Sequence, residues 1–164
     1  MKILLLGGNG ELGPHVVKAL EKRHTLRITD INNLQTDHEY IKVDSSDIDQ
    51  VVAAAENMDA IINLSVLRPD RKLAFDVNAR GCYNMMIAAR EHGIRRLINT
   101  GPFYAVTGPT YERFDHGIHV DVPHQPGTYL YALTKSLGQE ICTVMAPEQD
   151  AHVMDLLFYM FVDV

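Results

Sequence analysis

The chain has 164 residues, of which 46% are hydrophobic and 22% charged, and its formal net charge is −6. This length and apolar fraction predict a single domain with one sizeable core. The acidic balance and the scattered Lys and Arg residues exclude the basic surface that a nucleic-acid partner requires. No apolar run approaches the length of a membrane span, and no leader-like segment precedes the first apolar run. We therefore expect a cytoplasmic protein without a membrane partner.

The first predicted elements are a short apolar strand over residues 2–6 and an amphipathic helix over residues 15–22. Between them, glycines are spaced in the way that holds a dinucleotide. Gly7 allows a tight turn, Gly10 lets the backbone approach a pyrophosphate, and Gly13 permits close packing of helix on strand. The helix N-terminus would face the phosphates. The alternative is a glycine-rich turn without a ligand.

The next strand, over residues 25–30, ends in an acid at the position that selects a cofactor. Asp30 lies roughly twenty residues beyond the glycines, where a carboxylate accepts hydrogen bonds from ribose hydroxyls. It would repel a 2′-phosphate, and residues 31–34 offer no arginine to receive one, so NAD is favoured over NADP. The alternative is an aspartate that only initiates a turn.

Further along the chain, strand-like and helix-like segments alternate, which indicates an α/β fold. We predict a Rossmann-type doubly wound parallel sheet with helices on both faces and strand order 3-2-1-4-5-6. The later strands are expected over residues 39–43, 59–64, 95–100 and 151–161, and the later helices over 47–56, 71–92 and 129–145. Residues 101–127 are expected to form an irregular lid or substrate loop at the ligand-binding edge of the sheet.

Two residues of the helix predicted over 129–145 form a candidate proton-transfer pair. Tyr131 and Lys135 are four residues apart, so their side chains share one helix face. A neighbouring cation lowers the pKa of a phenol and lets it exchange a proton with a hydroxyl or carbonyl. Such pairs also occur by chance, and the glycine loop upstream is what gives this one its weight.

No metal site is predicted. Cys82 and Cys142 lack metal-ligand spacing and are expected to be buried thiols, with a redox or ligand role as the less favoured alternative. The eight histidines show no metal-binding pattern.

These segments together resemble the NAD-dependent epimerase/dehydratase family of extended short-chain dehydrogenases/reductases, over nearly the whole chain. The glycine loop and Asp30 look like the family's phosphate loop and ribose-binding acid. Asp44 and Ser45 resemble the segment whose aspartate contacts adenine. Leu64 and Ser65 look like the strand end that lines the cofactor.

A further match is the N-x-x-G-x-x-N helix motif that begins at Asn78, which lies near the cofactor in relatives. The resemblance implies an oxidoreductase that moves hydride between a substrate carbon and NAD. Tyr131 would be the acid/base, and Lys135 would hold the nicotinamide ribose. Thr100 is the candidate for the hydroxyl that binds the reacting oxygen, against the alternative that it only ends a strand.

The sequence departs from the family pattern at several points. Gly101 and Pro102 stand where a serine is expected, Ser45 replaces an apolar residue, and Glu11 replaces an aromatic residue in the phosphate loop. We still count Glu11 and Leu12 among the cofactor contacts.

Members of the family carry a smaller C-terminal substrate domain, and we expect residues 1–164 to be the NAD-binding domain without it, either as a fragment or as a shortened protein. The resemblance implies a small-molecule substrate, of which nucleotide sugars are the commonest in the family. The alternative is a non-catalytic NAD-binding module or degenerate remnant. The apolar residues 158–161 suggest an uncovered patch and a possible homo-oligomer.

Overall fold

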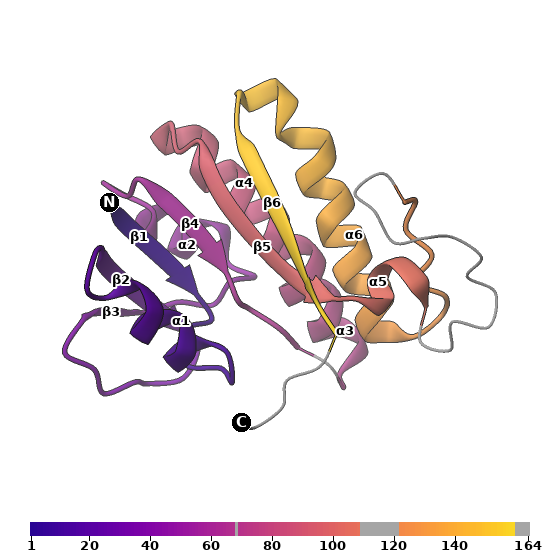
Figure 1. Cartoon of the computed structure of the whole chain (residues 1–164), viewed down its shortest axis with the longest axis horizontal. Helices are drawn as coiled ribbons and strands as arrows, with labels where there is room; N and C mark the ends of the chain where they lie inside the picture. The colour runs from indigo at the N-terminus through magenta and orange to yellow at the C-terminus, as the bar shows by residue number, and fades with distance from the viewer. Residues whose placement is uncertain (68, 109–121, 160–164) are drawn as a thin grey trace.

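A computed structural model of the chain describes residues 1–67, 69–108 and 122–159. Its centre is a six-stranded sheet in the order β3-β2-β1-β4-β5-β6 (Figure 1). Every neighbouring pair of strands is parallel. The predicted fold class and strand order are therefore confirmed.

The elements fall close to the predicted spans. The strands are β1 (Lys2–Leu6), β2 (Thr25–Asp30), β3 (Glu39–Lys42), β4 (Ala60–Asn63), β5 (Arg96–Pro102) and β6 (His152–Phe158). The α-helices are α1 (Gly13–Leu20), α2 (Ile48–Ala54), α3 (Arg71–Ala74), α4 (Gly81–His92), α5 (Tyr104–Thr107) and α6 (Leu130–Met145). A π-helical segment η1 (Phe75–Arg80) and a 3₁₀ turn η2 (Pro147–Gln149) complete the described elements.

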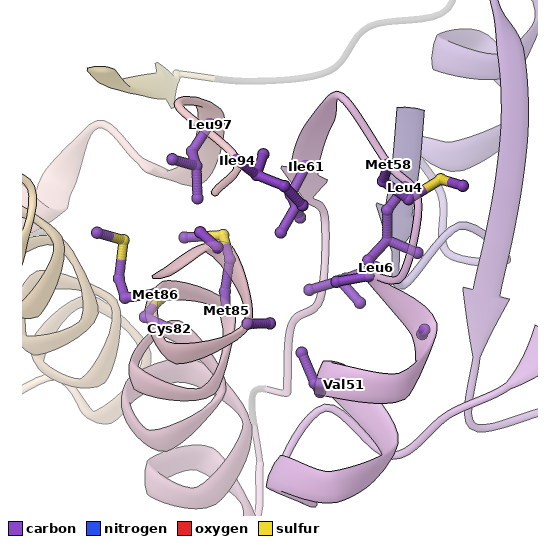
Figure 2. Packing of buried hydrophobic residues seen from close by; sticks show 14 of the residues in the cluster. Leu4, Leu6, Val51, Met58, Ile61, Cys82, Met85, Met86, Ile94 and Leu97 are labelled. Carbon is purple, nitrogen blue, oxygen red and sulfur yellow. The ribbon is translucent and has the colours of Figure 1, made fainter. Parts of the chain in front are cut away.

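Helices cover both faces of the sheet because β1 is apolar on both sides. Ile3 and Leu5 point into a cluster that α1 closes, whereas Leu4 and Leu6 point into a cluster with α2, α4 and α6. Figure 2 shows this second cluster, where Val51 from α2 faces Leu6 across the core. Burial on both faces explains why the strand reads as a continuous apolar run.

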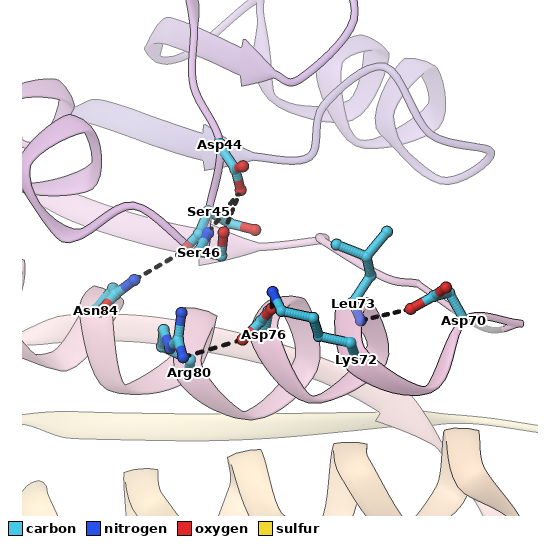
Figure 3. A network of polar contacts seen from close by, with 9 residues as sticks. All are labelled: Asp44, Ser45, Ser46, Asp70, Lys72, Leu73, Asp76, Arg80 and Asn84. Carbon is cyan, nitrogen blue, oxygen red and sulfur yellow. Dashed lines mark hydrogen bonds and ion pairs between the residues drawn. The ribbon is translucent and has the colours of Figure 1, made fainter.

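The predicted helix over 71–92 is interrupted by a π-helical segment, which the apolar periodicity did not reveal. Its six residues connect α3 to α4, and π turns are frequent at functional sites. The Asp76 carboxylate pairs with Lys72 at 2.6 Å and with Arg80 at 3.1 Å across this segment (Figure 3). The hydrogen bond from Lys72 is the main cause that lowers the pKa of Asp76.

The prediction of an irregular segment over residues 101–127 is wrong for the first residues of that range. Strand β5 continues to Pro102, and α5 follows almost at once. Pairing of residues 100–102 with β6 extends the strand, a tertiary contact that the local Gly-Pro sequence disfavours. Residues 109–121 lie outside the described part, as do residues 160–161 of the predicted last strand.

No helix in the described part of the chain is long and apolar enough to cross a membrane. The same part contains no group of three or more His, Cys, Asp or Glu side chains arranged to hold a metal ion.

The edge strand β6 exposes apolar side chains on one face. Met154 is 58% exposed and Leu156 37% exposed, and Tyr159 just after the strand is 65% exposed. In Figure 1, α6 lies behind β6, and the face of β6 that points away from α6 is turned toward the viewer. Adjacent exposed apolar residues on an edge strand favour association with another copy.

We predict that the chain self-associates at micromolar concentration and that Met154→Lys/Leu156→Lys makes it monomeric, because two ammonium groups on this face oppose association. Static light scattering measures the mass of both forms. Ile48→Lys on α2 is the control, since Ile48 is 38% exposed but lies on another surface. A monomeric unmodified chain would contradict the prediction.

Candidate functional site

A cavity of about 260 Å³ lies at the carboxyl ends of the central strands. This is the edge at which open α/β sheets bind ligands. The cavity gathers most of the predicted cofactor contacts, namely Gly7, Gly10, Asp30, Asp44, Ser45, Leu64 and Ser65. Five others do not line it: Glu11 is exposed, Leu12 packs against the α1 side of the core, Gly13 begins α1, and Asn78 and Lys135 are buried.

The glycine loop fits tightly against the rest of the cavity wall. Gly7 has a φ of +74°, and a Cβ there would lie 2.7 Å from the backbone nitrogen of Ser65. A Cβ at Gly13 would lie 1.9 Å from the carbonyl oxygen of Gly8. Only glycine satisfies both positions, and Gly7 and Gly10 line the cavity without side chains, which suits close approach of a pyrophosphate.

The Asp30 carboxylate is positioned by two backbone amides. One oxygen accepts a hydrogen bond from the Asn9 N–H in the glycine loop at 3.1 Å, and the other from the Asn32 N–H at 3.0 Å. The second contact is the turn-forming role considered from sequence, and the first ties the acid to the loop. Asp30 therefore both shapes the turn and presents negative charge to the cavity.

The Asp44–Ser45 segment forms the wall opposite the loop. The Asp44 carboxylate accepts hydrogen bonds from the Ser46 N–H and hydroxyl at 2.9 and 2.8 Å (Figure 3). The Asn84 side chain, on α4, donates to the Ser45 carbonyl at 2.9 Å. The last asparagine of the N-x-x-G-x-x-N motif thus fixes the backbone of this wall.

Asn78, the first asparagine of the motif, acts on the cavity through a neighbour. Its amide accepts from the Leu67 N–H at 3.1 Å and donates to the Leu67 carbonyl at 2.8 Å. It also donates to the Thr134 hydroxyl on α6 at 2.9 Å. Leu67 lines the cavity, so Asn78 shapes the wall, and direct contact of its amide with a cofactor stays a prediction.

Tyr131 and Lys135 lie one turn apart on α6, and Lys135 projects toward the ends of β4 and β5. The Lys135 ammonium, 1% exposed, donates to the carbonyl oxygens of Ser65 at 2.7 Å and Thr100 at 2.9 Å. A buried cation requires such partners. Because Ser65 also lines the cavity, Lys135 is held directly behind the cavity wall.

The Tyr131 ring, 9% exposed, belongs to a cluster of three tyrosines. Its centroid lies 6.3 Å from that of Tyr104 on α5 and 6.4 Å from that of Tyr129. Edge-on packing of this kind restricts the ring and helps to orient the phenol. Tyr104 is a residue of the site that sequence reasoning missed, because α5 was expected to be part of a loop.

The Thr100 hydroxyl is turned toward the sheet. It donates to the Asn63 carbonyl at 2.8 Å and is buried. Its oxygen keeps its capacity to accept a hydrogen bond. A role for Thr100 at a substrate oxygen stays a prediction.

Both cysteines are free and buried, as predicted. The hydrogen bond with Cys82 and burial raise the pKa of the Cys142 thiol well above its ordinary range.

These features define a class: a parallel α/β domain with a glycine-loop cavity at the carboxyl edge of its sheet and a Tyr-Lys pair beside it. The sequence profile of the NAD-dependent epimerase/dehydratase family matches residues 3–159. The chain belongs to this family. This confirms the resemblance found in the sequence, and NAD as the cofactor.

Individual relatives agree with this assignment. The chain is 31% identical to a uronate dehydrogenase of Pseudomonas syringae pv. tomato, over 87% of this chain and 53% of that protein. A short-chain dehydrogenase/reductase superfamily protein from Agrobacterium tumefaciens with bound NAD is 26% identical, with a TM-score of 0.83 over 96% of this chain and 48% of that one.

The UDP-glucose 4-epimerase of Thermus thermophilus, in complex with NAD, is 22% identical, with a TM-score of 0.83 over 96% of this chain and 54% of that one, and shares the fold. The chain therefore spans about half the length of the relatives it matches.

The glycine loop gives a prediction with a built-in control. Gly7→Ala should lower the free energy of unfolding by roughly 2–5 kcal/mol, from left-handed strain and overpacking against Ser65, and should abolish NAD binding. Gly93→Ala is the control, because Gly93 has a similar φ of +66° with nothing within 4 Å of a Cβ.

We expect Gly93→Ala to cost about 1–2 kcal/mol and to bind NAD normally. Chemical denaturation and calorimetric titration measure the two quantities. Equal losses in both variants would show that the contact with Ser65 is unimportant.

Proposed function

We propose that this chain is the NAD-binding part of a sugar oxidoreductase in which hydride passes between a hydroxyl-bearing carbon and NAD, with Tyr131 as the acid/base. The chain's span of about half of its relatives supports a separate substrate domain as part of this proposal. A cytoplasmic location, where NAD is available, is also part of it.

The observation that carries the proposal is the position of Ser65. Its backbone lines the cavity beside the glycine loop, and its carbonyl holds the Lys135 ammonium at 2.7 Å. A dinucleotide in the cavity would therefore extend toward the Tyr-Lys pair. Asp30 also lines the cavity, and its negative charge suits a ribose with free hydroxyls.

The chemistry divides between the cofactor and the chain's own residues. When bound, NAD supplies the hydride acceptor. Tyr131 accepts the proton of the substrate hydroxyl, and the Lys135 charge one turn away stabilises the phenolate. Thr100 is proposed to turn its hydroxyl from the Asn63 carbonyl and donate to the reacting oxygen, so that the substrate proton stays available to Tyr131.

The substrate class rests on relatives. Similarity to a uronate dehydrogenase favours a uronic acid, and the fold shared with a UDP-glucose 4-epimerase keeps nucleotide sugars as a second class. Oxidation of a uronic acid would need hydride and proton transfer only, which matches the residues of the Tyr-Lys pair.

One observation favours a second function, a non-catalytic NAD-binding module. The Thr100 hydroxyl donates to the Asn63 carbonyl, and the Lys135 ammonium donates to two carbonyls. Groups held in this way could serve the fold alone. A non-catalytic module would bind NAD and turn over no sugar.

The cofactor preference tests the role of Asp30. We predict that the chain binds NAD more tightly than NADP and that Asp30→Ala weakens NAD binding by about 1.5–3 kcal/mol and removes the preference. Asp37→Ala is the control, because Asp37 is an exposed acid nearby that does not line the cavity. Isothermal titration with both cofactors decides, and a preference retained in Asp30→Ala would assign it to another residue.

The acid/base role is tested in the full-length protein with a panel of uronic acids and nucleotide sugars, followed by NADH absorbance. Tyr131→Phe should lower kcat by roughly 10²–10⁴ and leave NAD affinity unchanged, because only the hydroxyl is removed. Tyr129→Phe is the control, since Tyr129 lies in the same ring cluster and is 46% exposed. Normal turnover by Tyr131→Phe would remove the phenol from the mechanism, and NAD binding without any turnover would support the non-catalytic module.

A further inference from the structure

Three polar side chains form a ladder across the buried end of the sheet. Asn63, Asn99 and Asp155 are register partners on β4, β5 and β6. Asn63 is 1% exposed and Asn99 is fully buried. The Asn63 amide donates to the Asn99 side-chain oxygen at 3.0 Å, and the Asn99 amide donates to the Asp155 carboxylate at 2.8 Å.

This ladder is out of place in a core of this type. Two residues earlier on the same strands, the register partners are Ile61, Leu97 and Val153, as expected for buried parallel strands. Replacing such apolar contacts with amides and a carboxylate carries a desolvation cost. Packing of the sheet alone therefore does not explain why these three positions are polar.

The hydrogen bonds of the ladder run in one direction. An ionised carboxylate only accepts, so Asp155 turns the Asn99 amide nitrogen toward itself and the Asn99 oxygen toward Asn63. The Asn99 side-chain oxygen therefore accepts a hydrogen bond from the Asn63 amide nitrogen. The Asn63 oxygen is left to accept the Ser65 N–H, at 3.1 Å.

The end of the ladder is the cradle of the catalytic lysine. Ser65, held by the Asn63 side chain, offers its carbonyl to Lys135. The second carbonyl in the cradle belongs to Thr100, whose hydroxyl donates to the Asn63 backbone. Asn63 thus holds both residues that receive the Lys135 ammonium.

We propose that Asp155 is a positioning residue that fixes the direction of the Asn63–Asn99 hydrogen bonds and, through them, the place of the Lys135 ammonium. It does not line the cavity, and it acts on Lys135 through the hydrogen bonds of two strands, in addition to the attraction between its carboxylate and the Lys135 ammonium. The inference rests on the proposed function, because it assigns Lys135 to the cofactor site.

The cost of the arrangement supports a functional purpose. Burial is the main cause that raises the pKa of the Asp155 carboxyl, and the Asn99 hydrogen bond opposes the rise. A raised folded-state pKa means that ionised Asp155 destabilises the fold as the pH rises through that pKa. The titratable groups that interact with it are His124, Lys135, Cys82 and Cys142.

The test compares Asp155→Asn and Asp155→Leu with the control Asp150→Asn. Asp150 precedes β6, is largely exposed in an ion pair with Arg95, and has a φ of +50° that asparagine tolerates. An amide at 155 can donate as well as accept, so it no longer fixes the ladder's direction.

We expect Asp155→Asn to bind NAD⁺ about twofold to thirtyfold more weakly than wild type, while its stability at neutral pH is equal or higher. Its stability advantage should shrink as the pH falls through the raised Asp155 pKa. Asp155→Leu should weaken binding further.

A second readout does not depend on cofactor binding. The ¹³Cε resonance of Lys135, in lysine-labelled protein without NAD⁺ and assigned by its loss in Lys135→Arg, should shift in both Asp155 variants and stay in Asp150→Asn. If wild type fails to bind NAD⁺, the proposed function fails, and this resonance still decides the positioning claim.

One outcome would overturn the inference: a Lys135 resonance in both Asp155 variants that matches Asp150→Asn. A parallel loss of stability and affinity beside that unmoved resonance would mark Asp155 as part of the fold only.

Discussion

The Lys135 ammonium, held between two backbone carbonyls, is the interaction on which the site depends. A charge that is 1% exposed is tolerated only where oxygen atoms replace its water, and here they come from the ends of β4 and β5. The contact therefore ties α6 to two strands at one edge of the sheet. Tyr131, one turn earlier on the helix, is placed at that edge by the same tie.

Close backbone approach is what allows α6 to reach this position. A Cβ at Gly138 would lie 2.3 Å from the Asn78 carbonyl oxygen and 2.7 Å from the Cys82 sulfur. The missing side chain lets α6 pack directly on η1, where Asn78 meets Thr134 at 2.9 Å. The π-helical segment thus joins the wall of the cofactor cavity to the helix that carries the proton-transfer pair.

The sheet is divided into an apolar part that stabilises it and a polar end that serves the site. The layer of Ile61, Leu97 and Val153 gains stability by burial of apolar surface. The layer of Asn63, Asn99 and Asp155 buries polar groups instead and joins them by directed hydrogen bonds. Concentrating the polar groups at the carboxyl ends places the desolvation cost where ligands bind.

The sequence by itself determined the strands, the glycine loop and the Tyr-Lys spacing, because these follow from local patterns of apolar residues, glycine and helical period. The strand order was predicted from the fold type that these patterns indicate. Only the tertiary structure decided the π-helical segment, α5, the buried side chain of Asn78 and the Asn63–Asn99–Asp155 ladder. Each of these depends on partners distant in the chain: Asn99 and Asp155 are 56 residues apart, as are Asn78 and Thr134. No local periodicity encodes which asparagine lines the cavity, which is buried, and which carbonyl receives the lysine.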